Sequence, residues 1–165
     1  MRTLHLGARA FIPVALAGAV LFSLAPSTPA AATTTTEAQQ IIQIARWQLG
    51  DPWHYGATGP YAFDCSGLVR YAFRRAGDAA VIHTGDLRSA RSIYLWFRAH
   101  GRASRTNPKV GDLVVWGYGS HIGIYIGNGK AISTLTNGVH IHGVYAVTAR
   151  FTAYLHTGMS IKPAS

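Results

Sequence analysis

The chain is organised around its only cysteine, Cys65, which stands where a glycine-rich stretch runs directly into a helical pattern. Asp64 is a favourable N-cap and Gly77 a favourable stop, so the pattern predicts a helix from Cys65 to Ala76. The thiol would occupy the first helical position, where unpaired N–H groups and the positive end of the helix dipole stabilise a thiolate. We therefore predict a thiol that is nucleophilic near neutral pH. The apolar face of this helix consists of Leu68, Val69, Ala72, Phe73 and Ala76.

The first 32 residues have the layout of a secretory signal peptide. Arg2 and Arg9 flank a short basic start, an apolar stretch follows, and a small-residue exit predicts cleavage after Ala30 or Ala32. The apolar stretch is short for a membrane span, although an uncleaved anchor is the alternative. The expected organisation is a signal peptide (1–32), a disordered spacer (33–37), one catalytic domain (38–157) and a tail (158–165).

Charge and cysteine usage narrow the class of partner. The formal net charge is +9, and a basic exported protein is attracted to anionic polymers such as those of cell walls. The arginines are scattered and not clustered with aromatic residues, so we expect no nucleic-acid groove. One cysteine in an exported chain cannot form an internal disulfide. Three roles remain for it: a reactive thiol, an intermolecular disulfide or a buried apolar side chain. We expect a monomer without an integral membrane segment after cleavage.

Helical patterns come first in the chain and strand patterns follow. Besides the helix at Cys65, apolar spacing predicts helices from Ala38 to Leu49 and from Asp86 or Ser89 to about His100. After Val110 the period changes to two, and glycine-containing turns separate short strands. Helices followed by adjacent strands favour an α+β fold, with N-terminal helices packed on an antiparallel sheet. The expected strands are Leu113–Trp116, His121–Ile126, Lys130–Leu135, Val139–Val147 and, as a last candidate, Phe151–His156.

A nucleophilic cysteine needs a base within hydrogen-bond reach, and His121 is the best-placed histidine. It begins a strand directly after a glycine-rich turn, and Gly123 beyond it allows a neighbouring backbone to approach. A helix N-terminus packed across this rim of the sheet would bring Cys65 to it. Other histidines lie in loops or at the ends of elements, where exposure to solvent is the default: His54, His83, His100 and His156.

Three blocks of the sequence resemble the signature blocks of the NlpC/P60 cysteine peptidases: FDCSGLV (63–69), GDLVV (111–115) and HIGIYIGNG (121–129). The resemblance implies a papain-like α+β fold. It also implies hydrolysis, without a cofactor, of amide bonds in the peptide stems of bacterial peptidoglycan by a secreted or wall-associated enzyme. On the matching positions Cys65 would be the nucleophile and His121 the general base. Asp64 and Ser66 would bind the substrate amine or shape the site.

The residue that orients the base departs from the family pattern, which most often has histidine at the position of Ser133. If the hairpin loop is the three residues 127–129, Gly123 lies opposite Ser133, and the serine shares the face of His121. A two-residue Asn-Gly loop would shift the register by one and turn Ser133 to the other face. A serine hydroxyl would stabilise an imidazolium less than a carboxylate would.

Two histidines of the next strand are alternatives for the third catalytic residue. His140 and His142 alternate with Ile141, so both point to one side of the strand, and either could replace Ser133. Two histidines at this spacing could also bind a metal. No nearby carboxylate or second cysteine supports such a site, so no metal is expected.

The second departure is Trp53, where the family often has a tyrosine whose hydroxyl helps to stabilise the oxyanion. Trp53 keeps a hydrogen-bond donor, the indole N–H, but this group lies at a different distance from the backbone than a tyrosine hydroxyl does. The alternative is that Trp53 only packs against the first helix. Two other functions remain open: a weak or inactive cell-wall-binding module of the same fold, and a thiol amidase or acyltransferase. An acyl groove could be lined by residues of the third helix, although core packing explains them more simply: Ile93, Tyr94, Trp96 and Phe97.

Overall fold

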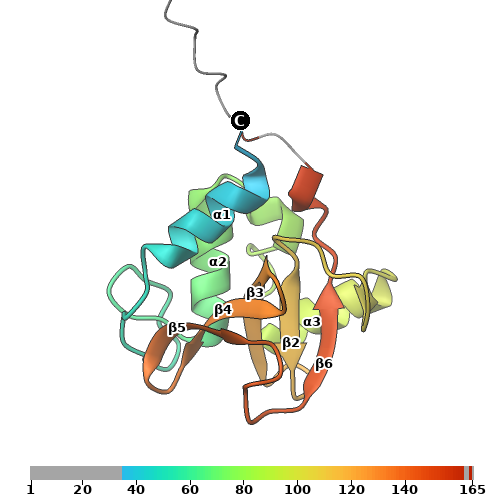
Figure 1. The fold of residues 1–165 in the computed structure, drawn as a ribbon. Coiled ribbons are helices and arrows are strands. Elements are labelled where there is room, and N and C mark those ends of the chain that lie inside the picture. Colours follow the sequence, from blue (N-terminus) through green and yellow to red (C-terminus); the bar gives the residue numbers. More distant parts are fainter. Residues whose placement is uncertain (1–34, 162–163, 165) are drawn as a thin grey trace, which may run out of the picture. The chain divides into compact units, whose positions relative to one another are not determined.

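The computed structural model describes residues 35–161 and 164, so the expected signal peptide, residues 1–32, lies outside the described residues. In the described part, helices precede a sheet of six antiparallel strands, which confirms the α+β class (Figure 1). The helices are α1 (Glu37–Arg46), α2 (Cys65–Arg75) and α3 (Ala90–Ala99), with short 3-10 helices η1 (Ala79–Ile82) and η2 (Met159–Ile161). The strands are β1 (Ala103–Ser104), β2 (Leu113–Trp116), β3 (His121–Gly127), β4 (Lys130–Leu135), β5 (Gly138–Gly143) and β6 (Phe151–Leu155).

Helix α1 begins and ends earlier than predicted. The side chain of Thr36 accepts a hydrogen bond from the backbone of Gln39, whose side chain accepts one from the backbone of Thr36. Glu37 is therefore helical, and it is buried, so the expected disordered spacer, residues 33–37, extends too far. At the other end, Leu49, the predicted last residue, lies beyond the helix and is 44% exposed.

The C-terminal residues expected as a tail, 158–165, also belong in part to the domain. Met159 is buried and packs in the main hydrophobic cluster. The backbone N–H of Ala164 donates to the carbonyl of Thr35 at 2.9 Å. Ordered structure therefore extends on both sides of the predicted range 38–157. No helix in the described part of the chain is long and apolar enough to cross a membrane.

The strands follow the order β1-β6-β2-β3-β4-β5, and each neighbouring pair is antiparallel. Strand β1 has only two residues, which is too short for an alternating pattern to reveal it. Strand β5 ends at Gly143 and not at Val147, because the chain then turns back across the sheet. The indole N–H of Trp116 donates to the carbonyl of Val144 at 2.7 Å and holds this returning segment.

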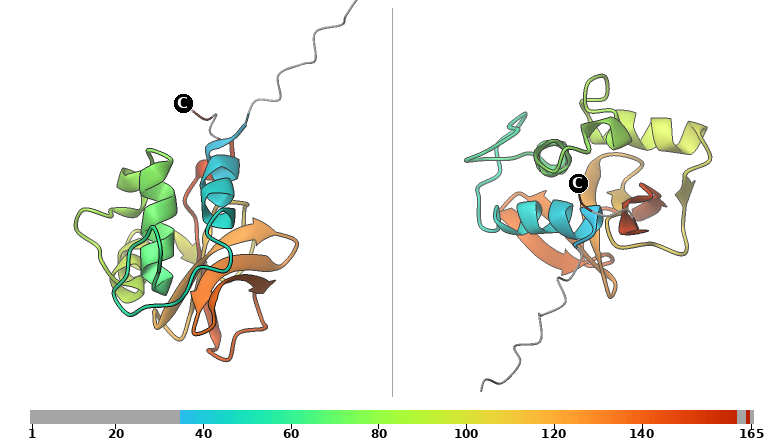
Figure 2. Two further views of the ribbon diagram at one scale, coloured as in Figure 1. Left: turned by 90° about the vertical axis from the view of Figure 1, so that its left-hand side faces the viewer. Right: turned by 90° about the horizontal axis from the view of Figure 1, so that it is seen from above.

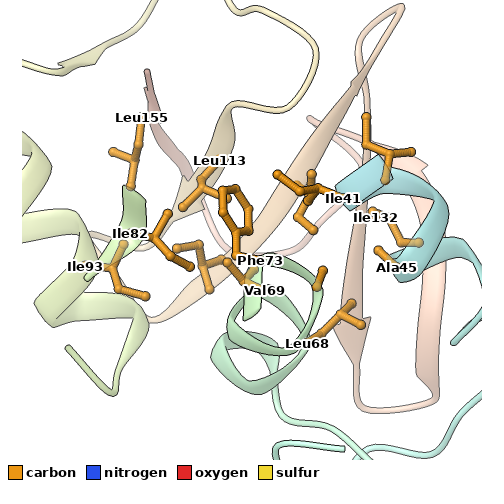
Figure 3. Packing of buried hydrophobic residues seen from close by; sticks show 14 of the residues in the cluster. Ile41, Ala45, Leu68, Val69, Phe73, Ile82, Ile93, Leu113, Ile132 and Leu155 are labelled. Atoms are coloured by element: carbon orange, nitrogen blue, oxygen red, sulfur yellow. The ribbon is translucent and has the colours of Figure 1, made fainter. Parts of the chain in front are cut away.

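The two faces of the sheet carry separate hydrophobic clusters. Helices α1 and α2 lie side by side against one face (Figures 1 and 2). There Leu68, Val69 and Phe73 of α2 pack with alternate strand residues such as Leu113 and Ile132 (Figure 3). Each fully buried side chain of this size contributes about 1.5–3 kcal/mol. A smaller cluster on the opposite face includes Val114, Trp116, Tyr125, Ala131 and Tyr154.

The β3–β4 hairpin has the shorter of the two loops that the sequence left open. Gly127 pairs with Lys130, so the loop consists of Asn128 and Gly129 alone. Both residues have positive φ, 51° and 67°, as expected for a two-residue turn that matches the twist of the strands. Of the two loop lengths considered from the sequence, the two-residue Asn-Gly loop is the one that the chain forms.

A β-bulge nevertheless keeps Ser133 on the predicted face. The register shifts between Tyr125 and Gly127, and beyond this bulge Ile124 pairs with Ile132. The shorter loop alone would shift the register by one residue. The extra residue of the bulge in β3 cancels this shift. Gly123 therefore still meets Ser133: a Cβ added to Gly123 would lie 2.8 Å from the Cβ of Ser133.

Candidate active site

Cys65 is the first residue of α2, as predicted, and its thiol is free and partly buried. Asp64 caps the helix, because its Oδ1 accepts from the N–H of Gly67 at 2.6 Å and from Ser66 Oγ at 2.9 Å. The preceding loop lies against this turn, since the N–H of Asp64 donates to the carbonyl of Ala57 at 2.9 Å. A Cβ added to Gly67 would lie only 2.0 Å from that carbonyl oxygen. The loop and the cap together fix the position of the cysteine.

Cys65 and His121 line the same surface cleft, so the structure brings together the helix start and the strand start that the sequence paired. The expected substrate-binding residues Trp53, Asp64 and Ser66 line it as well. Other walls come from the start of α3, the turn before β3, the turn after β4 and the segment that follows β5. The cleft therefore runs between the helical part of the domain and one rim of the sheet.

The pKa of the Cys65 thiol is raised, contrary to the prediction from the helix start. Burial is the largest cause, and the negative charge of Asp64 also raises the pKa. Hydrogen bonding by the backbone of Ile122, Ser66 and Cys65 itself lowers the pKa but does not outweigh burial. The contribution from Ile122 also indicates that the sulfur lies near the beginning of β3. Because the thiol is protonated at neutral pH, a neighbouring base has to remove its proton.

His121, the base expected from the sequence, is partly buried and has a hydrogen-bond partner on the next strand. Its Nε2 lies 2.9 Å from Ser133 Oγ, and Ser133 is fully buried behind it on β4. Burial, with His142 as the second cause, lowers the pKa of His121 to about 4. The imidazole is therefore neutral at pH 7 and able to accept a proton.

Ser133 has a second partner, and the contacts distinguish the two histidines that the sequence left as alternatives. Ser133 Oγ lies 2.7 Å from Nε2 of His142, whose Nδ1 lies 3.0 Å from the carbonyl oxygen of Gly143. His140 is opposite Ser133 in the register, but its Nε2 contacts the carbonyl oxygen of Asn137 at 3.0 Å. The described residues contain no group of three or more His, Cys, Asp or Glu side chains that could hold a metal ion.

Trp116 is a residue of this region that the sequence reasoning missed. It is fully buried and pairs with His121 across β2 and β3. Its ring centroid lies 5.2 Å from that of His121 and 5.7 Å from that of His142, so it packs beside both imidazoles. Its position at the end of an apolar strand gave no signal, because the contact depends on the strand register.

The NlpC/P60 family matches residues 50–157 of the sequence. The chain belongs to the NlpC/P60 family. It is 38% identical over 109 residues to the probable endopeptidase p60 of Listeria monocytogenes. The matched region covers 62% of this chain and 21% of that protein. It is 33% identical over 126 residues to a probable endopeptidase of Corynebacterium glutamicum. Here the matched region covers 76% of this chain and 54% of that protein. The matched part thus spans about a fifth to a half of these relatives.

Solved NlpC/P60 structures share the fold. The peptidoglycan hydrolase RipB of Mycobacterium tuberculosis has a TM-score of 0.56 and 28% identity, over 73% of this chain and 63% of that one. NlpC1 of Trichomonas vaginalis has a TM-score of 0.60 at 21% identity, over 76% of this chain and 46% of that one. These similarities agree with the papain-like α+β fold that the NlpC/P60 resemblance implied.

The second NlpC/P60 block, residues 111–115, has a structural role in this chain. Asp112 is 1% exposed, and its Oδ2 accepts from the N–H of Lys109 and contacts Nδ1 of His156, both at 2.8 Å. Its Oδ1 accepts from the N–H of Thr157 at 2.9 Å. These contacts fasten β2 to the segment after β6. His156 follows the end of β6, as expected, but it is bonded to a buried carboxylate and only partly exposed, so the default of a solvent-exposed histidine does not hold for it.

Proposed function

We propose that this NlpC/P60 domain is a secreted cysteine endopeptidase that hydrolyses amide bonds in the stem peptides of peptidoglycan. The observation that carries the proposal is a neutral His121, backed by Ser133, in the same cleft as Cys65. The relatives named as probable endopeptidases and the peptidoglycan hydrolase RipB support this substrate class. The leader-like residues 1–32 support export to the cell wall.

The reaction starts from a thiol and a neutral imidazole, because burial raises the pKa of Cys65 and lowers that of His121. Nδ1 of His121, the ring nitrogen not bonded to Ser133, takes the thiol proton while the sulfur attacks the carbonyl carbon of the scissile amide. The tetrahedral intermediate then breaks its C–N bond, and the imidazolium protonates the departing amine. A water molecule, deprotonated by His121, hydrolyses the resulting thioester, which releases a carboxylic acid and restores the thiol.

The start of α2 supplies further parts of the site. The backbone N–H of Cys65 is close enough to the sulfur to lower the thiol pKa, and we assign it as a donor to the oxyanion. Trp53 is 42% exposed and lines the cleft, where its indole N–H is available as a second donor. Asp64 uses Oδ1 to cap the helix, which leaves Oδ2 for a substrate amine. Ser66 acts by donating to Asp64.

The acyltransferase alternative has less support. Ile93 and Phe97 are fully buried in the main core and Tyr94 is 7% exposed, so these side chains are not free to line an acyl groove. Trp96 stacks on His100 with ring centroids 4.0 Å apart. Core packing therefore accounts for the apolar residues of α3, and the peptidase reading is preferred.

Surface charge supports attraction to anionic cell-wall polymers. Of the six acidic residues in the sequence, Glu37, Asp78 and Asp112 are buried. Without Arg2 and Arg9 of the expected leader the net charge falls from +9 to +7, and most of the basic side chains remain for the surface of the domain, although Arg70 is buried. We propose that a monomer reaches the wall through this charge.

Release of soluble fragments from purified peptidoglycan tests the proposal. The mature chain should release muropeptides, and Cys65→Ala should reduce the rate about 10³-fold or more, because the nucleophile is lost. Binding to sacculi should be unchanged by this substitution and should weaken with salt. If wild type and Cys65→Ala bind equally and neither releases fragments, the chain is a binding module. Turnover of acyl-lipids without turnover of stem peptides would instead favour the acyltransferase.

A further inference from the structure

We propose that His142 is a positioning residue of this site: through Ser133 it fixes which nitrogen of His121 carries the proton. The proposal rests on the proposed Cys65–His121 centre and explains how a serine can orient the base there. Three successive side-chain contacts carry it, at 2.9 Å, 2.7 Å and 3.0 Å, and they end on the backbone carbonyl of Gly143.

The Gly143 carbonyl sets the direction of the whole chain of hydrogen bonds. A carbonyl oxygen only accepts, so Nδ1 of His142 carries a proton. Nε2 of a neutral His142 then has a lone pair, and Ser133 Oγ donates its single proton to it. Ser133 Oγ consequently acts as the acceptor toward His121, whose Nε2 carries a proton. The lone pair of His121 is therefore on Nδ1, the nitrogen that takes the thiol proton in the proposed reaction.

A serine alone does not determine this arrangement, because its hydroxyl can rotate and serve either as donor or as acceptor. If Ser133 donated to Nε2 of His121, the proton of that imidazole would move to Nδ1, and the base would be unable to accept from Cys65. Ser133 is 0% exposed, so bulk water does not compete for its hydroxyl. His142 removes the ambiguity by taking up the only donor that Ser133 has.

The packing around the three residues keeps these distances short. A Cβ on Gly123 would lie 2.8 Å from the Cβ of Ser133, so glycine is what lets β3 and β4 approach at this point. Trp116 packs beside both imidazoles and is itself fixed by its bond to Val144. Proton transfer to His121 would strengthen its bond to Ser133, and the polarised hydroxyl would in turn strengthen its bond to His142.

Nitrogen-15 NMR of the histidine rings tests the proposal without relying on turnover. In the wild-type chain we expect the Nε2–H tautomer for His121 and the Nδ1–H tautomer for His142. In His142→Ala the His121 resonances should shift toward a mixture of tautomers. His140→Ala is the matched control, since that residue lies on the same strand but bonds to Asn137. An Nε2–H tautomer of His142 in the wild type would overturn the proposal, and this result does not depend on the folding of any variant.

Turnover gives a second readout. We expect His142→Ala to lower kcat/KM for peptidoglycan about 10- to 100-fold, as for other residues that orient a functional histidine from behind, while His140→Ala keeps the wild-type value. Adding Ser133→Asp to His142→Ala should recover most of the loss, because a carboxylate can only accept from His121 and needs no further partner to fix its role. Unchanged tautomers and unchanged kcat/KM in His142→Ala would refute the role of His142. An inactive wild type with the expected tautomers would instead count against the peptidase proposal alone.

Discussion

Acidification should destabilise the wild-type fold more than it destabilises a His121→Gln variant. The pKa of His121 is about 4 in the folded protein, against an ordinary value of 6.5. Below pH 6.5 the unfolded chain therefore takes up a proton that the folded protein does not, and stability falls as the pH falls. One pKa unit corresponds to about 1.4 kcal/mol, so the loss reaches about 3 kcal/mol near pH 4 and increases little below it.

Urea unfolding at pH 7, pH 5.5 and pH 4 measures this difference. Glutamine at position 121 keeps an N–H that can donate to Ser133 but does not titrate, so the other ionisable groups contribute similarly to both curves. We expect the free energy of unfolding of the wild type to fall by about 3 kcal/mol more than that of the variant between pH 7 and pH 4. Parallel decreases in the two proteins would mean that the folded imidazole titrates near its ordinary pKa, and the reasoning from burial would be refuted.

Two further substitutions test how the site is supported. Gly67→Ala should lower the free energy of unfolding by about 1–3 kcal/mol, because the new Cβ would meet the backbone oxygen of Ala57 at 2.0 Å. Thermal unfolding measures this loss. Gly85→Ala is the control, because a Cβ added there has no atom within 4 Å. Asp112→Asn should cost about 1.5–3 kcal/mol, because an amide replaces a buried acceptor of several hydrogen bonds. Asp86→Asn, at an exposed carboxylate, should leave the midpoint unchanged, and equal effects at positions 112 and 86 would contradict the buried network.

Local patterns were sufficient for the helix that carries the cysteine. The Asp64 cap and the apolar spacing after Cys65 are properties of a few neighbouring residues, so the start of α2 was predicted correctly. The pKa of the thiol was not, because the helix start is local, whereas burial depends on what packs over it. His156 shows the same limit, since its partner Asp112 is distant in the sequence.

The third residue of the site depended on strand pairing and could be predicted only in part. Alternation placed His140 and His142 on one face but could not choose between them. The choice follows from the contacts of the two rings, one with Ser133 and the other with the backbone of the β4–β5 turn. The sequence linked the face of Ser133 to the length of the hairpin loop, and Ser133 lies on the face of His121 despite the two-residue loop because a bulge compensates for the missing loop residue.

That bulge makes the hairpin tolerant of the loss of one residue. Removing Ile126, which lies between the paired residues Tyr125 and Gly127, would leave a regular hairpin with Gly127 still opposite Lys130. Strand β3 thus carries one residue more than its pairing requires. Loss of a single residue near the tip can be accommodated there, so a shorter hairpin need not separate the imidazole from its serine.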